Sequence, residues 1–291
     1  MNKNKLKGIG FIISAAFFFT LMSTFVRLSG DLPSMQKAFF RNLVAAVIAF
    51  ITLMKDGQGI HIEKKNLIWH FLRSAVGLGG IIGNFYAIDH LVLSNANMLN
   101  KMSPFFVLVF SFLVLKEKLK PLQIGAVAVA FIGSMFIIKP TFANVELLPS
   151  LAGFAGGMCA GFAYTMVRKL SLNGERGGVT VFFFSTFSCV VLLPIMISVW
   201  QPMTLKQLMF LLLAGASAAG GQFTITAAYS YAPGREISVY DYSQIIFSAI
   251  IGFMVFGDIP DGYSFIGYAL IITAAIVNSV YTNKLAKVSG Q

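Results

Sequence analysis

Charged residues are scarce in this sequence. They make up 11% of its 291 residues, whereas a soluble domain has about 25%. Hydrophobic residues make up 57%, and the mean hydropathy is +0.78. A chain of this composition has too few polar side chains to cover a water-soluble surface, so the sequence predicts an integral membrane protein.

Chemically reactive residues are also few. Cys159 and Cys189 both lie inside apolar runs, which argues against a disulfide framework or a thiolate metal site. His61, His70 and His90 are scattered near predicted loops, and the sequence has neither an HExxH nor a Gly-x-Ser-x-Gly motif. A GxxxxGK[ST] loop is absent as well, so ATP is not the expected energy source. We therefore expect no metal, no cofactor and no enzymatic activity, and a membrane-embedded enzyme is the weakest functional alternative.

Long apolar runs are what the sequence has instead. A spanning helix needs roughly 20 apolar residues, and runs bounded by charge, Gly or Pro predict an all-α protein with ten transmembrane helices. The first run has the basic front of a signal peptide, but it has an internal counterpart and is interpreted as a retained helix. The predicted helices cover residues 8–28, 35–54, 66–88, 93–115, 121–138, 149–170, 178–200, 207–231, 236–256 and 262–282.

Lys and Arg residues are distributed unequally between the two sides of these helices. Most of those in loops and at helix ends fall on the side of the N-terminus, and the others are Arg27, Lys37, Lys139 and Lys206. Cytoplasmic loops carry the excess of Lys and Arg, so both termini are predicted to be cytoplasmic in a plasma membrane, by preference a bacterial inner membrane. The net charge of +11 then follows from topology and contact with the lipid bilayer, and no nucleic acid partner is needed.

The second half of the chain repeats the first. An offset of 141 residues aligns every helix of the first half with one of the second, without a gap through the first four helices. Five helices per repeat is an odd number, so the second half enters the membrane from the opposite side. The sequence thus predicts two inverted five-helix repeats, residues 1–141 and 142–291, which let a central site open alternately to each face. The aligned identities include Thr24 with Thr165, Val26 with Val167, Arg27 with Arg168, and Phe112 with Phe253.

Two related segments carry a family resemblance. They are FLVLKEKLKPLQIGAVAVAFIGSMFI (Phe112 to Ile137) and FMVFGDIPDGYSFIGYALIITAAIV (Phe253 to Val277), each with an acid that closes a helix, a short turn and a glycine-led helix. The whole chain resembles the EamA-type ten-helix branch of the drug/metabolite transporter superfamily, in which two five-helix units flank a central cavity. Asp258 stands where that family usually has glutamate. The resemblance implies a transporter, and such relatives include exporters and importers of amino acids, organic acids, amines and vitamins.

Four ionisable residues fall at membrane depth: Arg41, Arg73, Lys101 and Asp241. Each costs roughly 2.5–3.5 kcal/mol there, so such side chains normally face a cavity or a partner. At about 1.5 Å per residue, Lys101 and Asp241 are expected about 12 Å apart in depth, too far for a direct ion pair. Pro104 is expected to kink its helix and to free a backbone carbonyl close to Lys101.

Polar side chains recur at helical spacing on two equivalent helices. Ser238, Asp241 and Gln244 form a stripe on the ninth helix, and the offset aligns the first two with Asn97 and Asn100 on the fourth. Two symmetry-related helices thus present matching polar faces. We predict that they face a substrate cavity lined by Lys101, Asn97, Asn100, Arg73, Ser238, Asp241, Gln244, Gln222 and Tyr242.

Several of these residues have a second interpretation. Arg41 fits snorkelling or packing as well as a substrate role, and Arg73 fits neutralisation of Asp241. Gln222 fits interhelical hydrogen bonding. Asp241 is either a structural counter-ion or a proton carrier, which makes it the candidate for energy coupling.

The charges of the predicted cavity select a substrate class. At membrane depth three cations, Arg41, Arg73 and Lys101, stand against one acid, Asp241. This balance favours a carboxylate, or a zwitterion whose carboxylate faces Lys101 and whose amino group faces Asp241. The sequence therefore predicts a secondary active transporter of a small organic metabolite, such as an organic acid or amino acid, with protons as the candidate coupling ion. The alternative on the same scaffold is an exporter of amines or hydrophobic drugs. A monomer contains the full symmetry, so a dimer is not required.

Overall fold

The computed structural model describes residues 3–57, 59–116, 121–138, 146–232 and 237–288, and this part of the chain contains helices and no strand. Seven segments are long and apolar enough to cross a membrane, and three shorter apolar helices complete the ten that the sequence predicts. The predicted all-helical fold is confirmed, with ends within a few residues of the expected ranges. The elements are α1 (Lys3–Leu28), α2 (Ser34–Lys55), α3 (Lys64–His90), α4 (Leu93–Asn100), α5 (Ser103–Leu115), α6 (Pro121–Ile138), α7 (Leu147–Leu172), α8 (Gly177–Ser198), α9 (Leu205–Tyr231), η1 (Ser238–Tyr242), α11 (Ser243–Phe256) and α12 (Gly262–Val288).

Two of the ten segments are divided. The fourth consists of α4 and α5, which are separated at Lys101 and Met102, and the ninth consists of the 3₁₀ helix η1 followed by α11. Pro104 lies in the first turn of α5, where its missing N–H needs no partner. Ile245 occupies the equivalent position in the second half, so that division arises without a proline. The ninth segment thus differs from the continuous α-helical stripe that its spacing predicts, because its first residues have a period of three.

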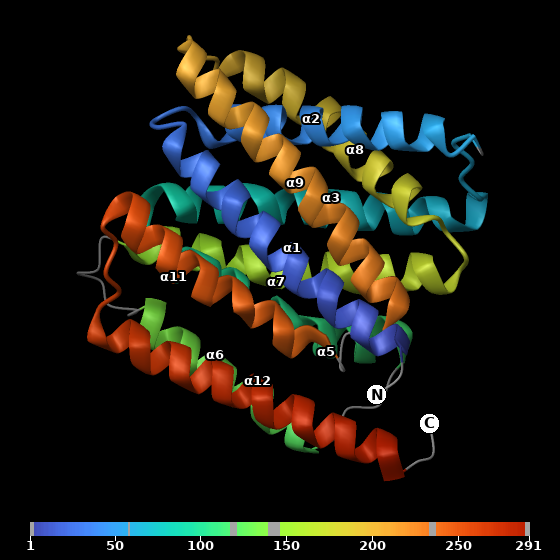
Figure 1. The fold of residues 1–291 in the computed structure, drawn as a ribbon, viewed down its shortest axis with the longest axis vertical. Coiled ribbons are helices and arrows are strands. Elements are labelled where there is room, and N and C mark those ends of the chain that lie inside the picture. Colours follow the sequence, from blue (N-terminus) through green and yellow to red (C-terminus); the bar gives the residue numbers. More distant parts are fainter. Residues whose placement is uncertain (1–2, 58, 117–120, 139–145, 233–236, 289–291) are drawn as a thin grey trace.

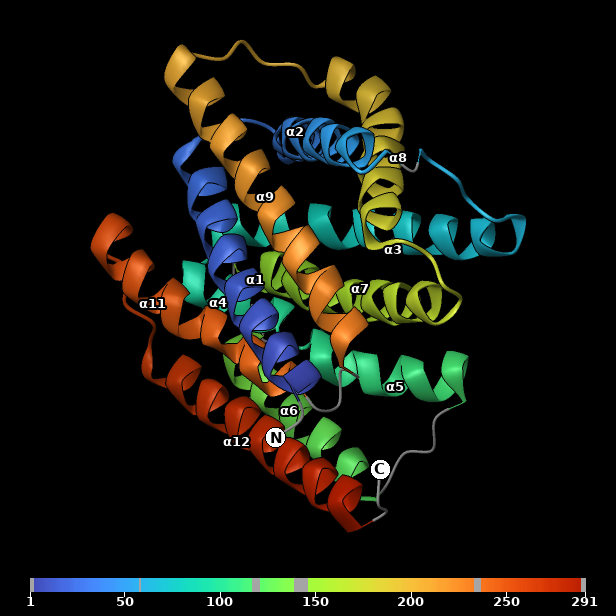
Figure 2. The ribbon, with the colours of Figure 1, turned by 45° about the vertical axis from the view of Figure 1, so that its right-hand side comes forward.

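The helices pair in a way that follows the internal repeat. α1 packs along α9 and α3 packs along α7, and these two pairs are equivalent under the offset of 141 residues. α2 packs with α8 and α6 packs with α12, so each of these pairs joins an element to its own counterpart. α4 packs with α11, so the fourth segment contacts the ninth segment, which is its counterpart. In Figures 1 and 2, α2 and α8 lie at one end of the molecule, α6 and α12 lie at the other, and the remaining helices lie between them. The pseudo-twofold axis therefore passes through the middle of the molecule, where the divided segments meet.

Glycines on α7 let this helix approach the division between α4 and α5. A Cβ at Gly157 would lie 2.5 Å from the Leu99 carbonyl oxygen, and one at Gly161 would lie 2.7 Å from the Ser103 carbonyl oxygen. Side chains do not tolerate such distances, so glycine is required for this close packing. α7 thus supports the backbone on both sides of Lys101.

The two divided segments end alike. Lys116 and Gly257 are equivalent under the offset, and both adopt the left-handed backbone conformation, with φ of +56° and +69°. The turn after Gly257 brings Asp258 back against the end of α11, where its N–H donates to the Gly252 carbonyl at 3.2 Å. Glu117, the predicted counterpart of Asp258, lies outside the described residues, as does the predicted boundary between the repeats at residues 141 and 142.

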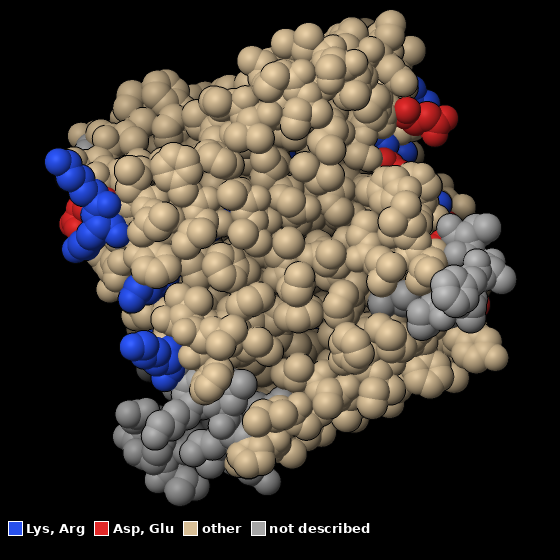
Figure 3. Space-filling model, turned by 180° about the vertical axis from the view of Figure 1, so that it is seen from behind, with Lys and Arg blue, Asp and Glu red and all other residues tan. Residues whose placement is uncertain are grey.

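The surface matches a protein that sits in a bilayer. Figure 3 shows a face whose broad middle is free of blue and red, with Lys, Arg, Asp and Glu gathered at two opposite edges. Large apolar side chains are exposed on the outer helices, for example Phe50 on α2, Val190 on α8 and Met254 on α11. In Figure 1 the start of α1 and the end of α12 lie toward the same edge. The chain is a multi-pass membrane protein.

Candidate functional site

The site is built where the two divided segments meet. The N–H of Phe105 bonds to the Met102 carbonyl at 3.1 Å, which leaves the Lys101 carbonyl without its usual helical partner. The Tyr242 hydroxyl donates to this carbonyl at 3.0 Å. Lys101 and Tyr242 are counterparts under the offset of 141 residues. A residue that contacts its own counterpart lies beside the pseudo-twofold axis, so this contact marks the axis.

Lys101 and Asp241 form a buried ion pair at the axis. Nζ of Lys101 donates to Oδ2 of Asp241 at 2.6 Å, and each side chain is 2% exposed. The depth difference of about 12 Å expected from the sequence is wrong, because it treats both helices as straight rods that rise about 1.5 Å per residue. Both segments are divided here. Lys101 lies beside its counterpart Tyr242 at the axis, and Asp241, the residue before Tyr242, therefore also lies beside Lys101. Oδ1 of Asp241 has no hydrogen-bond partner.

The divided helices also set the local electrostatics. Lys101 follows the C-terminus of α4, where carbonyl groups carry partial negative charge, and precedes the N-terminus of α5, where N–H groups carry partial positive charge. Asp241 lies two residues before the start of α11, where negative charge is favoured. Secondary transporters use such helix ends near the membrane midplane to hold charged groups.

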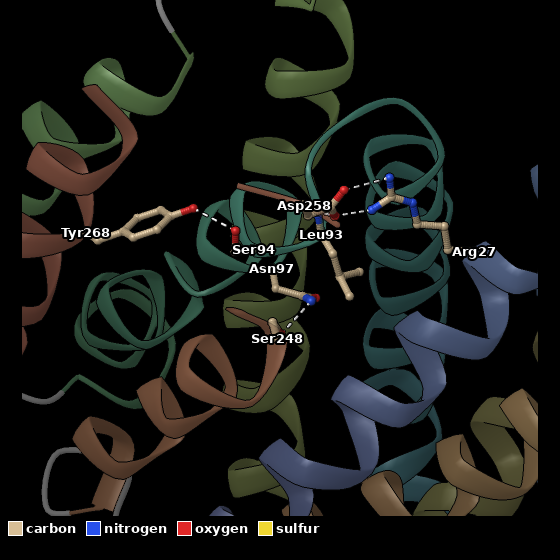
Figure 4. A network of polar contacts seen from close by, with 7 residues as sticks. All are labelled: Arg27, Leu93, Ser94, Asn97, Ser248, Asp258 and Tyr268. Atoms are coloured by element: carbon tan, nitrogen blue, oxygen red, sulfur yellow. Dashed lines mark hydrogen bonds and ion pairs between the residues drawn. The ribbon is translucent and has the colours of Figure 1, made fainter. Parts of the chain in front are cut away.

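Asn97 ties α4 to the second half of the chain. Its amide donates to Ser248 at 2.9 Å, and its carbonyl oxygen accepts from Gln244 at 3.1 Å and from Ser23 at 3.2 Å. Figure 4 shows Asn97 facing Ser248 between α4 and α11. Because these contacts occupy its side chain, Asn97 positions α4 rather than facing the cavity.

A cavity lies beside Lys101. Residues of both halves line it. Its apolar lining includes Phe19 and Met22 from α1 and Phe85 from α3. Its polar lining consists of Arg41, Arg73, Asn84, Asn100, Lys101, Tyr164, Gln222 and Gln244. The described residues that line it therefore include three cations and no acid.

Arg41 on α2 and Arg73 on α3 both reach this cavity beside Phe184 of α8. The guanidinium carbon of Arg73 lies 3.4 Å from the centre of the Phe184 ring, and that of Arg41 lies 5.8 Å from it. Nη2 of Arg73 donates to the Gln222 side-chain oxygen at 2.8 Å, and Nη1 of Arg41 donates to the Asn42 side-chain oxygen at 2.6 Å. Both arginine side chains are buried, so Arg41 does not snorkel to the membrane surface.

The structure separates the predicted site residues into two groups. Five of them line the cavity: Lys101, Asn100, Arg73, Gln222 and Gln244. Asp241, Tyr242 and Asn97 are buried outside the lining, the first two against Lys101. Arg73 bonds to Gln222, so it does not act as the partner that neutralises Asp241. The side chain of Ser238 lies outside the described residues, and its role stays a prediction.

Sequence reasoning did not single out Asn84. It lines the cavity on the same helix as Arg73, and its side-chain oxygen is buried without a partner. Arg73, Gly77, Gly80 and Asn84 all line the cavity at intervals of four, three and four residues, which is one face of a helix. This spacing is the sequence signal that could have found Asn84.

A second polar cluster joins the two halves at the end of α1. The guanidinium of Arg27 pairs with both carboxylate oxygens of Asp258, and the N–H of Leu93 donates to Asp258 at 3.0 Å. Figure 4 shows Asp258 between Arg27 and the start of α4. The carboxylate thus caps the N-terminus of α4 and links it to α1.

A third polar cluster surrounds His70 on α3. Nε2 of His70 lies 3.3 Å from the Glu175 carboxylate, and the Asn66 amide donates to the same carboxylate at 3.0 Å. His70 is buried in the protein rather than placed in a loop. In the part of the chain that the structure describes, His, Cys, Asp and Glu form no group of three or more that could hold a metal ion.

Comparison with known proteins places this fold among transporters. The pseudopaline exporter CntI of Pseudomonas aeruginosa (strain UCBPP-PA14) is 29% identical over 274 residues, which are 94% of this chain and 95% of that protein. The riboflavin transporter of Brucella anthropi is 28% identical and covers 84% of this chain and 87% of its own. The S-adenosylmethionine uptake transporter of Rickettsia bellii is 22% identical, with coverage of 88% and 86%. A solved crystal structure has the same fold, with a TM-score of 0.72 at 15% identity over 95% of this chain and 98% of that one.

The family assignment rests on nearly the whole length of the chain. The model of the EamA-like transporter family matches twice, over residues 6–139 and again over residues 147–280. Each match covers one half of the ten-helix fold. This chain belongs to the EamA-like transporter family.

Proposed function

We propose that this protein is a secondary active transporter that moves a small carboxylate-bearing or zwitterionic metabolite by alternating access. The observation that carries the proposal is the Lys101–Asp241 pair at the pseudo-twofold axis, beside a cavity whose described lining holds cations and no acid. A site on this axis has the same relation to both membrane faces. Alternating access by two inverted repeats requires such a site.

The ion pair offers one position for each charge of a zwitterion. A substrate carboxylate competes with Asp241 for the Lys101 ammonium group, which lines the cavity. Asp241 then loses its partner, and its carboxylate binds either the substrate amino group or a proton. Asp241 is therefore the residue that we propose for proton coupling.

The relatives support transport of small organic molecules. Their names include an exporter and an uptake transporter, so they support the function without selecting its direction. We place the protein in a bacterial inner membrane with both termini cytoplasmic, because most loop Lys and Arg residues fall on that side. The single chain contains both repeats, so a monomer is sufficient for transport.

Transport into proteoliposomes tests this proposal. Wild-type protein should accumulate at least one labelled amino acid or organic acid from a panel, and Lys101→Met should not, at equal amounts of folded, inserted protein. Lys37→Met is the matched control, because Lys37 is as deeply buried and pairs with Asp89 at 2.6 Å outside the cavity. Uptake by Lys101→Met at the wild-type rate would remove Lys101 from the site. Equal loss of uptake in both variants would show that transport depends on buried lysines in general and would remove the specific role of Lys101.

Export of amines or hydrophobic drugs is the competing function. Arg41, Arg73 and Lys101 would repel a cationic substrate, and no acid among the described lining residues would attract it. Amine transport that proceeds equally in wild-type protein and Lys101→Met would favour this second function.

A further inference from the structure

Two buried arginines in the cavity lack an acidic partner. Arg41 is 1% exposed and Arg73 is 2% exposed. Nε of Arg41 and both Nε and Nη1 of Arg73 make no hydrogen bond. Within the described chain, neither guanidinium forms an ion pair with a carboxylate.

The other buried cations of the described chain are neutralised. Lys37 pairs with Asp89 and Lys101 pairs with Asp241, each at 2.6 Å. The ion pair at the axis is therefore electrically neutral. The two arginines leave the cavity with an excess of two positive charges, which no described side chain balances.

The arrangement of the two guanidinium groups is costly for the ligand-free protein. Both are buried, and both lie beside the ring of Phe184, so two desolvated positive charges repel each other there. Their hydrogen bonds to Asn42 and Gln222 fix the orientation of the two guanidinium groups, but these partners carry no negative charge. A planar carboxylate matches the fork of N–H donors that a guanidinium presents, so an acidic ligand would satisfy both charge and geometry.

We propose that the cavity binds an organic diacid, with one carboxylate held by Arg41 and Arg73 and the other by Lys101. This assignment rests on the proposed transport function and names its substrate class. Its two carboxylates balance the excess of two positive charges in the cavity, and the second carboxylate displaces Asp241 from Lys101. Phe19, Met22 and Phe85 line the same cavity, so the body of the diacid that lies between its carboxylates is apolar.

Tyr164 and Gln244 add polar groups to the cavity that contains the two acid-binding positions. Tyr164 lines the cavity from α7, together with Arg41, Arg73 and Lys101. Gln244 reaches the cavity from α11, next to Lys101. Both offer hydrogen bonds to the carboxylate oxygens of the ligand. A monoacid of the same shape would reach only one of the two positions.

Binding to purified protein tests the diacid assignment by comparing matched ligands. The probes are an aryl-substituted glutarate and its monoamide, which differ in one negative charge and have nearly the same shape. Wild-type protein should bind the diacid about 10- to 100-fold more tightly, the range expected for one charge-assisted hydrogen-bond pair. Arg41→Gln and Arg73→Gln should each reduce this preference to below about threefold. Lys101→Met should weaken binding of both probes.

A stability measurement separates this role from a structural one. If the arginines are paired only when an acidic ligand binds, Arg41→Gln and Arg73→Gln should leave the melting temperature of the ligand-free protein unchanged or raise it. Each substitution removes an unpaired buried charge. Retained preference for the diacid in both variants, or a fall in ligand-free melting temperature in both, would overturn the proposal.

The same titrations distinguish failure of this proposal from failure of the proposed function. Equal wild-type affinity for diacid and monoamide, with both lost in Lys101→Met, would refute the arginine subsite and leave a carboxylate transporter standing. Absence of binding by any acid, with binding of amines, would refute both.

Discussion

Removal of one partner from the Lys101–Asp241 pair should destabilise the protein far more than removal of both. Each side chain is buried, and a lone charge left in such a site costs about 3–5 kcal/mol. Lys101 lines the cavity, which leaves room for water beside a lone ammonium group, so we expect the loss caused by Asp241→Leu to lie at the lower end of this range, near about 3 kcal/mol. The variant Lys101→Met/Asp241→Leu removes both charges and should return to within about 1 kcal/mol of wild type.

Equilibrium unfolding in mixed micelles measures this double-mutant cycle. The bond from the Tyr242 hydroxyl to the Lys101 carbonyl involves the backbone and persists in every variant, so the cycle isolates the charge pair. The interaction free energy should be at least about 2 kcal/mol. Additive losses, with the double variant as unstable as the sum of the single ones, would show that the two residues do not interact and would refute the account of the axis.

Three further perturbations test other parts of the site. Asp241→Asn should abolish pH-driven accumulation in proteoliposomes while substrate exchange continues, and accumulation that survives would rule out Asp241 as the proton carrier. Gly157→Val should reduce stability by at least about 1–3 kcal/mol in the same micelle assay, because its side chain would meet the Leu99 carbonyl; a loss below about 0.5 kcal/mol would contradict the close packing of α7 on α4. Asp258→Asn removes the charge that caps α4, so a cysteine introduced at Val92 should react faster with maleimide. Unchanged labelling would show that the Arg27 cluster does not hold the start of α4 in place.

The sequence allowed the fold to be predicted because its signals are long and local. Apolar runs set the ten segments, and the constant offset, visible in matches such as Arg27 with Arg168, revealed the inverted halves. Lys101 was predicted as a cavity residue from its depth and from the matching polar faces of the fourth and ninth helices, and the structure places it in the cavity lining.

The pairing of Lys101 with Asp241 could not be read from helix depth. Depth along a straight helix ignores the division of both segments, and 3₁₀ geometry at η1 has no clear sequence signal. The offset of 141 residues could have predicted the pairing. It aligns Lys101 with Tyr242, the neighbour of Asp241, and two counterparts can lie side by side at the pseudo-twofold axis. Arg41 was ambiguous for a different reason: position along a helix does not tell whether a side chain near its start points to the membrane surface or inward.

Thermal stabilisation of purified protein by a panel of amino acids, mono- to tricarboxylates, amines and nucleosides is the most direct test of the central claim. A ligand that binds the folded state raises the melting temperature. We predict that an acid raises it in wild-type protein and not in Lys101→Met. A shift caused by amines or bulky apolar compounds alone, and of equal size in both proteins, would contradict a transporter whose substrate carboxylate binds at Lys101.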